Sequence, residues 1–428
     1  MVDAPGIPVG PAAGALDAAA AVDPDRLWRR HMAMARHGAT AAGGVNRQAL
    51  SPEDVAARRE LRGWAREIGL QPSIDDIGNL FLRLPGADAD AAPVLAGSHM
   101  DSQPTGGRFD GIYGVLAALE AVEAMRETGT TPRRPIDVVA WTNEEGSRFA
   151  PGMMGSSVFA GRRDLAAMLR VRDADGVSVA DALAGLMAAE SELPKRQGTT
   201  APAAYLEAHI EQGPILEAKG VPVGVVTGIQ GKLTLRVTVT GERGHAGTVP
   251  QDERKDALAA AVALISAMQD AIADGGPDVK FTVGRFDTTP NAPSVIPSGV
   301  DFSIDLRHPD DGVLQDLGDR IADICRPERA GCDVRLDELS NDQALEFPEA
   351  LRALVGASAD GLQIASMPIL SAAGHDARHL HYMCPTAMIF VPCRAGVSHR
   401  EDEHADADHL ADGARTLTAA LATLADAG

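Results

Sequence analysis

The hydrophobic and polar positions of the first part of the chain predict helices and strands in alternation. From Leu27 to Leu70 apolar residues recur at helical spacing, with good helix formers such as those of Asp54–Ala65. From Pro93 onward the pattern predicts strands at Pro93–Ser98, Ile136–Trp141 and Tyr205–His209, and a helix at about Tyr113–Arg126. Because the predicted strands are separated by helices, we expect an α/β fold with a mixed, largely parallel sheet covered by helices.

The pattern changes near Gly231, where a second domain is predicted to begin. Leu233–Thr240 alternates like a half-exposed strand, and Lys255–Ala273 has the periodicity of a long amphipathic helix. Further strands are predicted near Val279–Phe286, Val300–Leu306 and Asp333–Leu336, with a helix near Gly312–Cys325. This βαββαβ order fits a compact sheet with two helices on one face.

After about Asn341 the pattern of the first part resumes, and it ends in a predicted helix near Asp408–Leu424. We therefore expect a discontinuous catalytic domain of residues 1–230 and 340–428. A smaller domain of residues 231–339 is expected to be inserted into it.

Composition and charge narrow the class of protein. The chain has 428 residues, 45% of them hydrophobic, which is enough for two cores. Its net charge of −21 argues against nucleic acid as a partner, because phosphate binding needs clustered Lys and Arg. The four cysteines form no CxxC pair, no apolar run approaches the roughly 20 residues of a membrane span, and no basic segment opens a signal peptide. We expect a cytoplasmic protein that binds no membrane.

His99 and Asp110 are the first candidates for chemistry. His99 follows directly on an apolar strand, and Asp110 lies in the glycine-rich loop Gly106–Gly111. A strand-end imidazole and a loop carboxylate could ligate one metal ion, and a carboxylate can also bridge two ions. We expect Asp101 to accept the other ring N–H of His99 and so to orient the imidazole.

Glu144 and Glu145 follow the next predicted strand, in the sequence Trp-Thr-Asn-Glu-Glu-Gly. Adjacent acids are ordinarily a solvated turn, but these lie between a buried strand and a glycine-rich stretch. Two such carboxylates can divide the work of hydrolysis, since one can ligate a metal while the other accepts a proton from water.

Two further histidines complete the candidate set. His209 lies at the end of a predicted strand, and His399 lies in Gly-Val-Ser-His-Arg-Glu near the C-terminus. Three imidazoles and several carboxylates suit zinc, manganese or cobalt. The residues alone therefore indicate a dinuclear metal site and leave its substrate open.

Several blocks of the sequence together resemble one known family. They are Gly97–Asp101, Gly106–Gly114, Trp141–Phe149, Glu207–Glu217, Gly244–Thr248, Gly374–Ala377 and Val397–Glu401. From about His31 to the C-terminus the chain is similar to the hydantoinase/carbamoylase family of aminoacylase-like dinuclear metallohydrolases. That family includes N-carbamoyl-L-amino acid hydrolases, β-ureidopropionases and allantoate amidohydrolases.

The resemblance implies a role for each metal-site candidate. His99 and His209 would hold one ion, Glu145 and His399 the other, and Asp110 would bridge the two. Glu144 would be the general base that takes a proton from water and passes it to the leaving amine. The implied reaction releases ammonia, carbon dioxide and the free amino acid from an N-carbamoyl-L-amino acid.

The resemblance also implies how the substrate is bound. Arg307 matches the family's carboxylate-binding arginine, and a guanidinium can hold a carboxylate through two parallel hydrogen bonds. Gln212 and His375 match residues that line the site. His245 matches a histidine of the inserted domain that stabilises the oxyanion in a partner subunit's site. These roles imply a homodimer whose inserted domain is a lid and dimerisation domain.

One position departs from the family pattern and affects the expected substrate. The family commonly has Asn immediately before Val295-Ile296-Pro297, where this chain has Ser294, with Asn291 three residues upstream. A β-ureidopropionase or an allantoate amidohydrolase therefore remains an alternative. An N-acyl amino acid hydrolase or dipeptidase is a further one, although the wider clan usually has a carboxylate where this chain has His209.

Overall fold

The computed structural model describes residues 6–196, 200–326 and 329–427, and it divides into two compact units. The larger unit comprises Met1–Thr227 and Phe347–Gly428, and the smaller unit comprises Gly228–Glu346. Each unit has its own cluster of buried apolar side chains. The smaller unit extends beyond the expected range of 231–339 at both ends, because the strands that enter and leave it continue past those residues.

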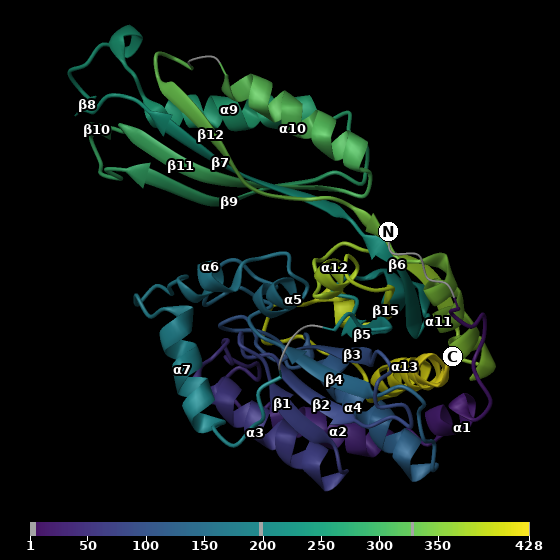
Figure 1. The fold of residues 1–428 in the computed structure, drawn as a ribbon. Coiled ribbons are helices and arrows are strands. Elements are labelled where there is room, and N and C mark those ends of the chain that lie inside the picture. The colour runs from purple at the N-terminus through teal and green to yellow at the C-terminus, as the bar shows by residue number, and fades with distance from the viewer. Residues whose placement is uncertain (1–5, 197–199, 327–328, 428) are drawn as a thin grey trace. The chain divides into compact units, whose positions relative to one another are not determined.

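The larger unit is built on a nine-stranded sheet with a parallel centre (Figure 1). The strand order is β1 (Gln71–Ile74), β2 (Leu80–Leu84), β4 (Ile136–Trp141), β3 (Val94–His99), β5 (Ala204–Ile210), β15 (Thr386–Val391), β6 (Val223–Ile229) and β13 (Leu345–Glu346), with β14 (Ser366–Ser371) also paired to β6. Strands β4, β3, β5 and β15 are mutually parallel, and their neighbours β2 and β6 are antiparallel to them. The predicted mixed, largely parallel sheet is thus confirmed.

Helices bury the central strands from both sides. Every residue of β3, β4, β5 and β15 is buried, including the polar residues Asp137 in β4 and Glu207 in β5. In Figure 1, α4 (Ile112–Glu127) and α13 (Ala407–Asp426) lie together below the sheet, and α5 (Met154–Phe159) and α12 (Ala377–Leu380) lie above it. Other helices of this unit are α1 (Ala15–Ala20), α2 (Pro24–Met34), α3 (Pro52–Glu67), α6 (Leu165–Leu169), α7 (Val179–Ala189), α8 (Ile215–Lys219), α11 (Glu349–Gly361) and the short η2 (Arg394–Gly396).

The helical pattern from Leu27 to Leu70 is resolved into two helices, α2 and α3. Asp23 and Ser51 cap their N-termini by accepting backbone N–H groups, and each cap is followed by a proline at the first helical position. This pairing of a capping side chain with a proline starts a helix efficiently and separates α3 from the preceding loop.

The smaller unit is a four-stranded antiparallel sheet with two helices. Its order is β12 (Asp333–Asp342), β7 (Gly231–Thr240), β11 (Gly299–His308) and β9 (Lys280–Thr289). Helices α9 (Ala257–Ile272) and α10 (Asp311–Cys325) pack against it, with the short η1 (Gln251–Glu253) between β8 and α9. A two-stranded sheet of β8 (Gly244–His245) and β10 (Val295–Ile296) was not predicted.

The two strands that connect the units are hydrogen-bonded to each other. β6 leads into the smaller unit and β13 leads out of it, with Ile229 opposite Leu345 and Gly228 opposite Glu346. The insertion therefore begins and ends at one antiparallel pair. Among the described residues, no helix is long and apolar enough to cross a membrane.

Candidate metal centre

The chemical candidates of the larger unit gather beyond the carboxyl ends of its parallel strands. His99 is the last residue of β3, Glu144 and Glu145 follow β4, and His209 is near the end of β5. His399 follows β15 after a short loop. Because parallel strands end at one edge of a sheet, residues 300 positions apart in sequence come together here.

Two overlapping groups of side chains could each hold a metal ion. The first is His99, Asp110 and His209, and the second is Asp110, Glu145 and His399. Within each group the ligand atoms lie within 4.8 Å of one another. The structure thus brings together all five residues expected to bind metal.

Asp110 belongs to both groups because its two oxygens face opposite ways. Oδ1 lies 3.5 Å from Nε2 of His99 and 3.2 Å from Nε2 of His209. Oδ2 lies 3.2 Å from Nε2 of His399, which is also 3.4 Å from Oε2 of Glu145. A carboxylate in this position can contribute one oxygen to each of two ions.

Gly111 allows the loop before α4 to approach His99. Its φ of +65° lies in the left-handed region, and a Cβ at this position would be 2.3 Å from the ring of His99. Glycine alone meets both requirements without strain. The close approach places Asp110 directly beside the two imidazoles of the first group.

The histidine rings of the first group are oriented as metal ligands require. Nδ1 of His99 is 2.9 Å from the backbone oxygen of Asp101, and Nδ1 of His209 is 2.9 Å from the backbone oxygen of Ile210. Because a carbonyl oxygen can only accept a hydrogen bond, Nδ1 carries the hydrogen in each ring and Nε2 keeps its lone pair. Nε2 of His209 accepts the backbone N–H of Gly111 at 3.1 Å, which agrees with that tautomer. The donor set therefore fits a divalent metal.

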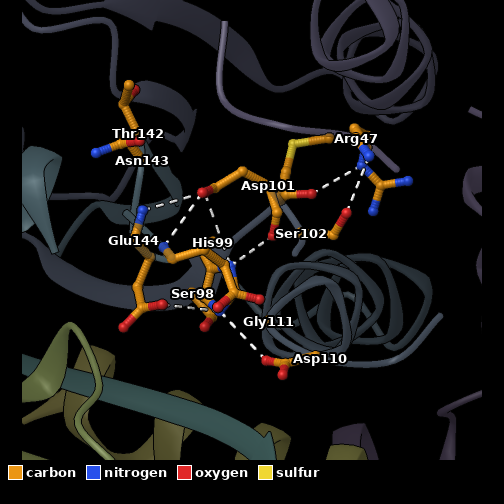
Figure 2. A network of polar contacts seen from close by, with 12 residues as sticks. Arg47, Ser98, His99, Asp101, Ser102, Asp110, Gly111, Thr142, Asn143 and Glu144 are labelled. Carbon is orange, nitrogen blue, oxygen red and sulfur yellow. Dashed lines mark hydrogen bonds and ion pairs between the residues drawn. The ribbon is translucent and has the colours of Figure 1, made fainter. Parts of the chain in front are cut away.

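The carboxylate of Asp101 has a different partner from the one expected. It lies 3.8 Å from Nδ1 of His99, and the ring instead meets the backbone oxygen of the same residue. Its two oxygens accept the backbone N–H groups of Glu144 at 3.1 Å and Glu145 at 3.2 Å (Figure 2). Asp101 thus fixes the loop after β4 and orients His99 through its main chain.

Glu144 and Glu145 point to different parts of the centre. Oε2 of Glu144 is 3.6 Å from Nε2 of His99, whereas Glu145 belongs to the second group with His399. Burial raises the pKa of Glu144 well above its usual range, and the nearby acids Asp376, Glu145 and Asp101 add to the effect. Burial and Asp110 raise the pKa of Glu145 to about 7.

The histidines respond to the same crowding of carboxylates. Although burial opposes a charged ring, Glu144 and Asp110 raise the pKa of His99 well above its usual range. A hydrogen bond to Asp110 raises the pKa of His399 to about 9. An excess of buried negative charge around three imidazoles is the environment that divalent cations neutralise.

Gln212 and His375 lie against the metal-site residues. Nε2 of Gln212 donates to Oδ2 of Asp110 at 2.8 Å and to Oγ of Ser398 at 3.0 Å. The ring of His375 packs edge-on against His209 with centroids 4.4 Å apart, and its Nε2 is 3.2 Å from Oγ of Ser371. Burial and His209 lower the pKa of His375 well below its usual range.

The remaining predicted residues belong to the smaller unit, at two ends of its sheet. His245 lies in β8 opposite Val295, and Ser294 accepts the backbone N–H of Ala246. Ser294 and Asn291 both have positive φ, so the loop between β9 and β10 is sharply bent. Arg307 lies near the opposite end of β11, where Asp305 accepts its Nε at 2.7 Å and its Nη2 at 3.1 Å.

Several side chains that contact the metal-site residues were not predicted, among them Gln103, Glu403 and Ser398, whose Oγ lies 3.0 Å from Oδ2 of Asp110. Nε2 of Gln103 donates to Oε2 of Glu145 at 2.7 Å. Glu403, which is 1% exposed, accepts the backbone N–H groups of Phe109 and Asp110 at 2.9 and 3.1 Å. Polar residues this close to the predicted ligands in sequence are a weak signal, because most such residues face solvent.

The chain is similar in sequence and in fold to known proteins. Residues 95–423 match the model of peptidase family M20/M25/M40. The chain is 40% identical to an N-carbamoyl-L-amino-acid amidohydrolase of Rhizobium meliloti, over 95% of this chain and 97% of that protein. It is 35% identical to an allantoate amidohydrolase of Bacillus subtilis (strain 168), over 92% of this chain and 95% of that protein. The crystal structure of an amidase of the hydantoinase/carbamoylase family from Burkholderia vietnamiensis matches this chain with a TM-score of 0.86 and 43% sequence identity. The match covers 95% of this chain and 98% of that chain.

Proposed function

This chain belongs to peptidase family M20/M25/M40 and to the hydantoinase/carbamoylase amidases within it, and on that premise we propose that it hydrolyses N-carbamoyl-L-amino acids. It is a metal-dependent hydrolase of carbon–nitrogen bonds in linear amides. The proposed reaction consumes one water and converts the N-carbamoyl amino acid into the free amino acid, ammonia and carbon dioxide.

The observation that carries the proposal is the position of Asp110 between two groups of donors. One oxygen faces His99 and His209, and the other faces His399, beside Glu145. This arrangement supports a dinuclear centre of zinc, manganese or cobalt. When bound, a pair of such ions supplies Lewis acidity, which polarises the scissile carbonyl and makes water more acidic.

Glu144 is the general base of the proposed mechanism. Glu145 contacts His399 and accepts a hydrogen bond from Gln103. The Glu144 carboxylate, which lies next to His99, is therefore the one that can accept a proton. It takes a proton from the attacking water and delivers it to the leaving nitrogen.

Substrate binding is assigned to residues of both units. Arg307 binds the substrate carboxylate through two N–H groups, and Gln212 holds the ureido group next to Asp110. His245 donates a hydrogen bond to the developing oxyanion. Asn291, Ser294 and His375 complete the site, with Ser294 adjoining the β8–β10 pair that carries His245.

The separation of His245 and Arg307 within the smaller unit supports a site shared between two chains. His245 lies in β8, beyond the Gly299 end of β11, and Arg307 lies next to the other end (Figure 1). At about 3.4 Å per residue, the strand alone separates them by roughly 25 Å. A substrate the size of a carbamoyl amino acid cannot span that distance. One smaller unit therefore serves two substrates, which a homodimer provides.

The proposal is tested by ammonia release from a panel of substrates. The purified protein, loaded with Zn²⁺, Mn²⁺ or Co²⁺ in separate preparations, is given N-carbamoyl-L-α-amino acids, N-carbamoyl-D-α-amino acids, N-carbamoyl-β-alanine and allantoate. We expect the highest kcat/KM for an N-carbamoyl-L-α-amino acid. Preference for allantoate, to whose hydrolase the chain is 35% identical, would replace the proposed substrate but keep the chemistry.

A further inference from the structure

We propose that Glu403 is a positioning residue that holds Asp110 between its two donor groups. The inference rests on the proposed metal centre and extends it to a side chain that binds neither ion. Glu403 lies four residues after His399, in the segment between that ligand and α13. Its carboxylate is buried and turned toward the loop that carries Asp110.

Glu403 accepts a pair of hydrogen bonds from the backbone of the Asp110 loop. A single oxygen, Oε1, receives the N–H groups of Phe109 and Asp110 at 2.9 and 3.1 Å. These are the amides of the bridging residue and of the residue before it. A charged acceptor on two consecutive amides fixes the direction of the main chain there, and with it the direction of the Asp110 side chain.

The other oxygen of Glu403 contacts Ser398. Oε2 of Glu403 lies 3.0 Å from Oγ of Ser398, and the same hydroxyl lies 3.0 Å from Oδ2 of Asp110. Ser398 is the residue before His399. The carboxylate of Glu403 thus connects the loop that carries the bridging ligand with the loop that carries a ligand of the second group.

Gly107 leaves space for this carboxylate. A Cβ on Gly107 would be 2.0 Å from both Cδ and Oε1 of Glu403, closer than any side chain could tolerate. The backbone of Gly107 has no left-handed φ, so its conformation does not itself demand glycine. The absence of a side chain here therefore makes room for Glu403.

The acidity of Glu403 also argues against a purely structural role. Its carboxyl group lies in a buried acidic cluster, where burial and the charge of Asp110 raise its pKa to about 7. A neutral side chain could fill the same volume without the cost of burying an acid. An acid at this place is explained if it aligns the ligands for cations.

The test measures metal binding by the full chain, independently of turnover. Protein freed of metal by a chelator is titrated with Zn²⁺ by calorimetry, and apoprotein folding is checked by circular dichroism and thermal unfolding. Outer residues that orient metal ligands typically affect affinity about 10–100-fold. We expect Glu403→Ala to weaken both Zn²⁺ steps by such a factor, since Asp110 contacts both groups. Glu403→Gln keeps one oxygen for the two amides and should lose less than about 10-fold.

Gly107→Ala provides an independent variant, because its methyl group would displace the same carboxylate. We expect a similar loss, and we expect Gly107→Ala combined with Glu403→Ala to be little worse than either alone. Asp402→Asn is the matched control, since this neighbouring acid is exposed and paired only with Arg400 among the described ion pairs. It should bind Zn²⁺ like the wild type.

Three results would overturn the inference. Unchanged Zn²⁺ affinities in Glu403→Ala, with a lowered unfolding temperature, would leave Glu403 a merely structural residue while the proposed centre stands. If the losses of Zn²⁺ affinity from the Gly107 and Glu403 substitutions are fully additive, the two positions act independently, and Gly107 does not make room for Glu403. If the wild type binds no Zn²⁺, both the proposed metal centre and this role of Glu403 are contradicted. If Glu403→Ala does not fold, Glu403→Gln and Gly107→Ala carry the same test.

Discussion

Glu144 and Glu145 are neighbours in sequence, yet their carboxylates have different partners. Glu145 is 3.4 Å from His399 and accepts a hydrogen bond from Gln103, whereas Glu144 faces His99. Asp101 makes this division possible, because it holds the two backbone N–H groups and so fixes both side chains at once.

This division predicts opposite outcomes for two conservative substitutions. Glu144→Gln should keep the metal content of the wild type and reduce kcat by about 10²–10⁴-fold, because the amide cannot accept the proton. Glu145→Gln, its matched control, should lose one ion because the amide is a poor ligand. Metal analysis and kcat on each purified variant check both statements. Metal loss in Glu144→Gln with retention in Glu145→Gln would reverse the roles.

His31 predicts a pH dependence of stability at a residue outside the centre. Its ring is fully buried against Phe109 and Tyr113, and burial together with Arg47 lowers its pKa to about 3. In the unfolded chain the pKa is near 6.5. Between these values the unfolded chain binds a proton that the folded chain does not, so the free energy of unfolding falls as the pH falls.

Substitution of this residue tests that sign. His31→Phe keeps an aromatic ring and removes the titration. Between pH 7.5 and pH 5 the free energy of unfolding of the wild type should fall by roughly 2 kcal/mol more than that of the variant. Urea unfolding of both metal-free proteins at both pH values measures this difference. The contributions of the other histidines are the same in both proteins and cancel when the two are compared. An equal pH dependence in both proteins would contradict the buried, neutral state of His31.

At the scale of elements, the sequence predicted what carries a periodic signal. The helices α4, α9 and α10 are long enough to show a helical pattern, and the strands β3, β4 and β5 stand out as short, mainly apolar segments. The two-residue strands β8 and β10 have no detectable period, and their pairing depends on the bend at Asn291 and Ser294. The five metal-site residues were found from motifs, whereas Glu403 and the true partner of Asp101 depend on how loops fold back, which no local pattern records.

The β6–β13 pair predicts that the smaller unit can be removed as one element. Ile229 and Leu345 are opposite each other in an antiparallel ladder, so Asn-Gly in place of residues 230–344 would close them as a tight hairpin. Because the larger unit has its own core, we expect the shortened chain to fold and to bind Zn²⁺ like the full chain. Its kcat/KM should fall by at least about 10²-fold, since His245 and Arg307 are lost.

Circular dichroism, calorimetry with Zn²⁺ and ammonia release measure these three properties on the same preparation. A matched control replaces only 246–248, the turn after His245, with glycines and keeps the rest of the unit. Failure of the shortened chain to bind Zn²⁺ while it remains folded would mean that the centre needs residues of the insertion.

For the whole molecule, the proposed sharing of each site between two chains predicts complementation between inactive chains. His245→Ala and Glu144→Gln subunits are each expected to be inactive. In a mixed dimer with trans sites, one site has an intact Glu144 and receives the intact His245 of the other chain. One of the two sites in each mixed dimer should therefore be active. Mixing under exchange conditions should give each mixed dimer up to about half of the activity of a wild-type dimer. Mixing each variant with itself is the control.

No recovery after proven subunit exchange would contradict the trans arrangement. In that case each chain would complete its own site, and every mixed dimer would carry one defect in each. Subunit exchange is verified by mass spectrometry of differently tagged chains. The unmixed variants set the background against which recovery is judged.

The ligands of the centre are spread over about 300 residues, from His99 to His399, and this spacing has a consequence during synthesis. Ribosomes add about 5–20 residues per second, so roughly 15–60 s pass between the first ligand and the last. Until then the nascent chain can offer Asp110 with His99 and His209 but lacks His399. In the proposed dinuclear centre, any ion captured early would therefore occupy a half-built site, and the second ion could be loaded only after His399 has been synthesised.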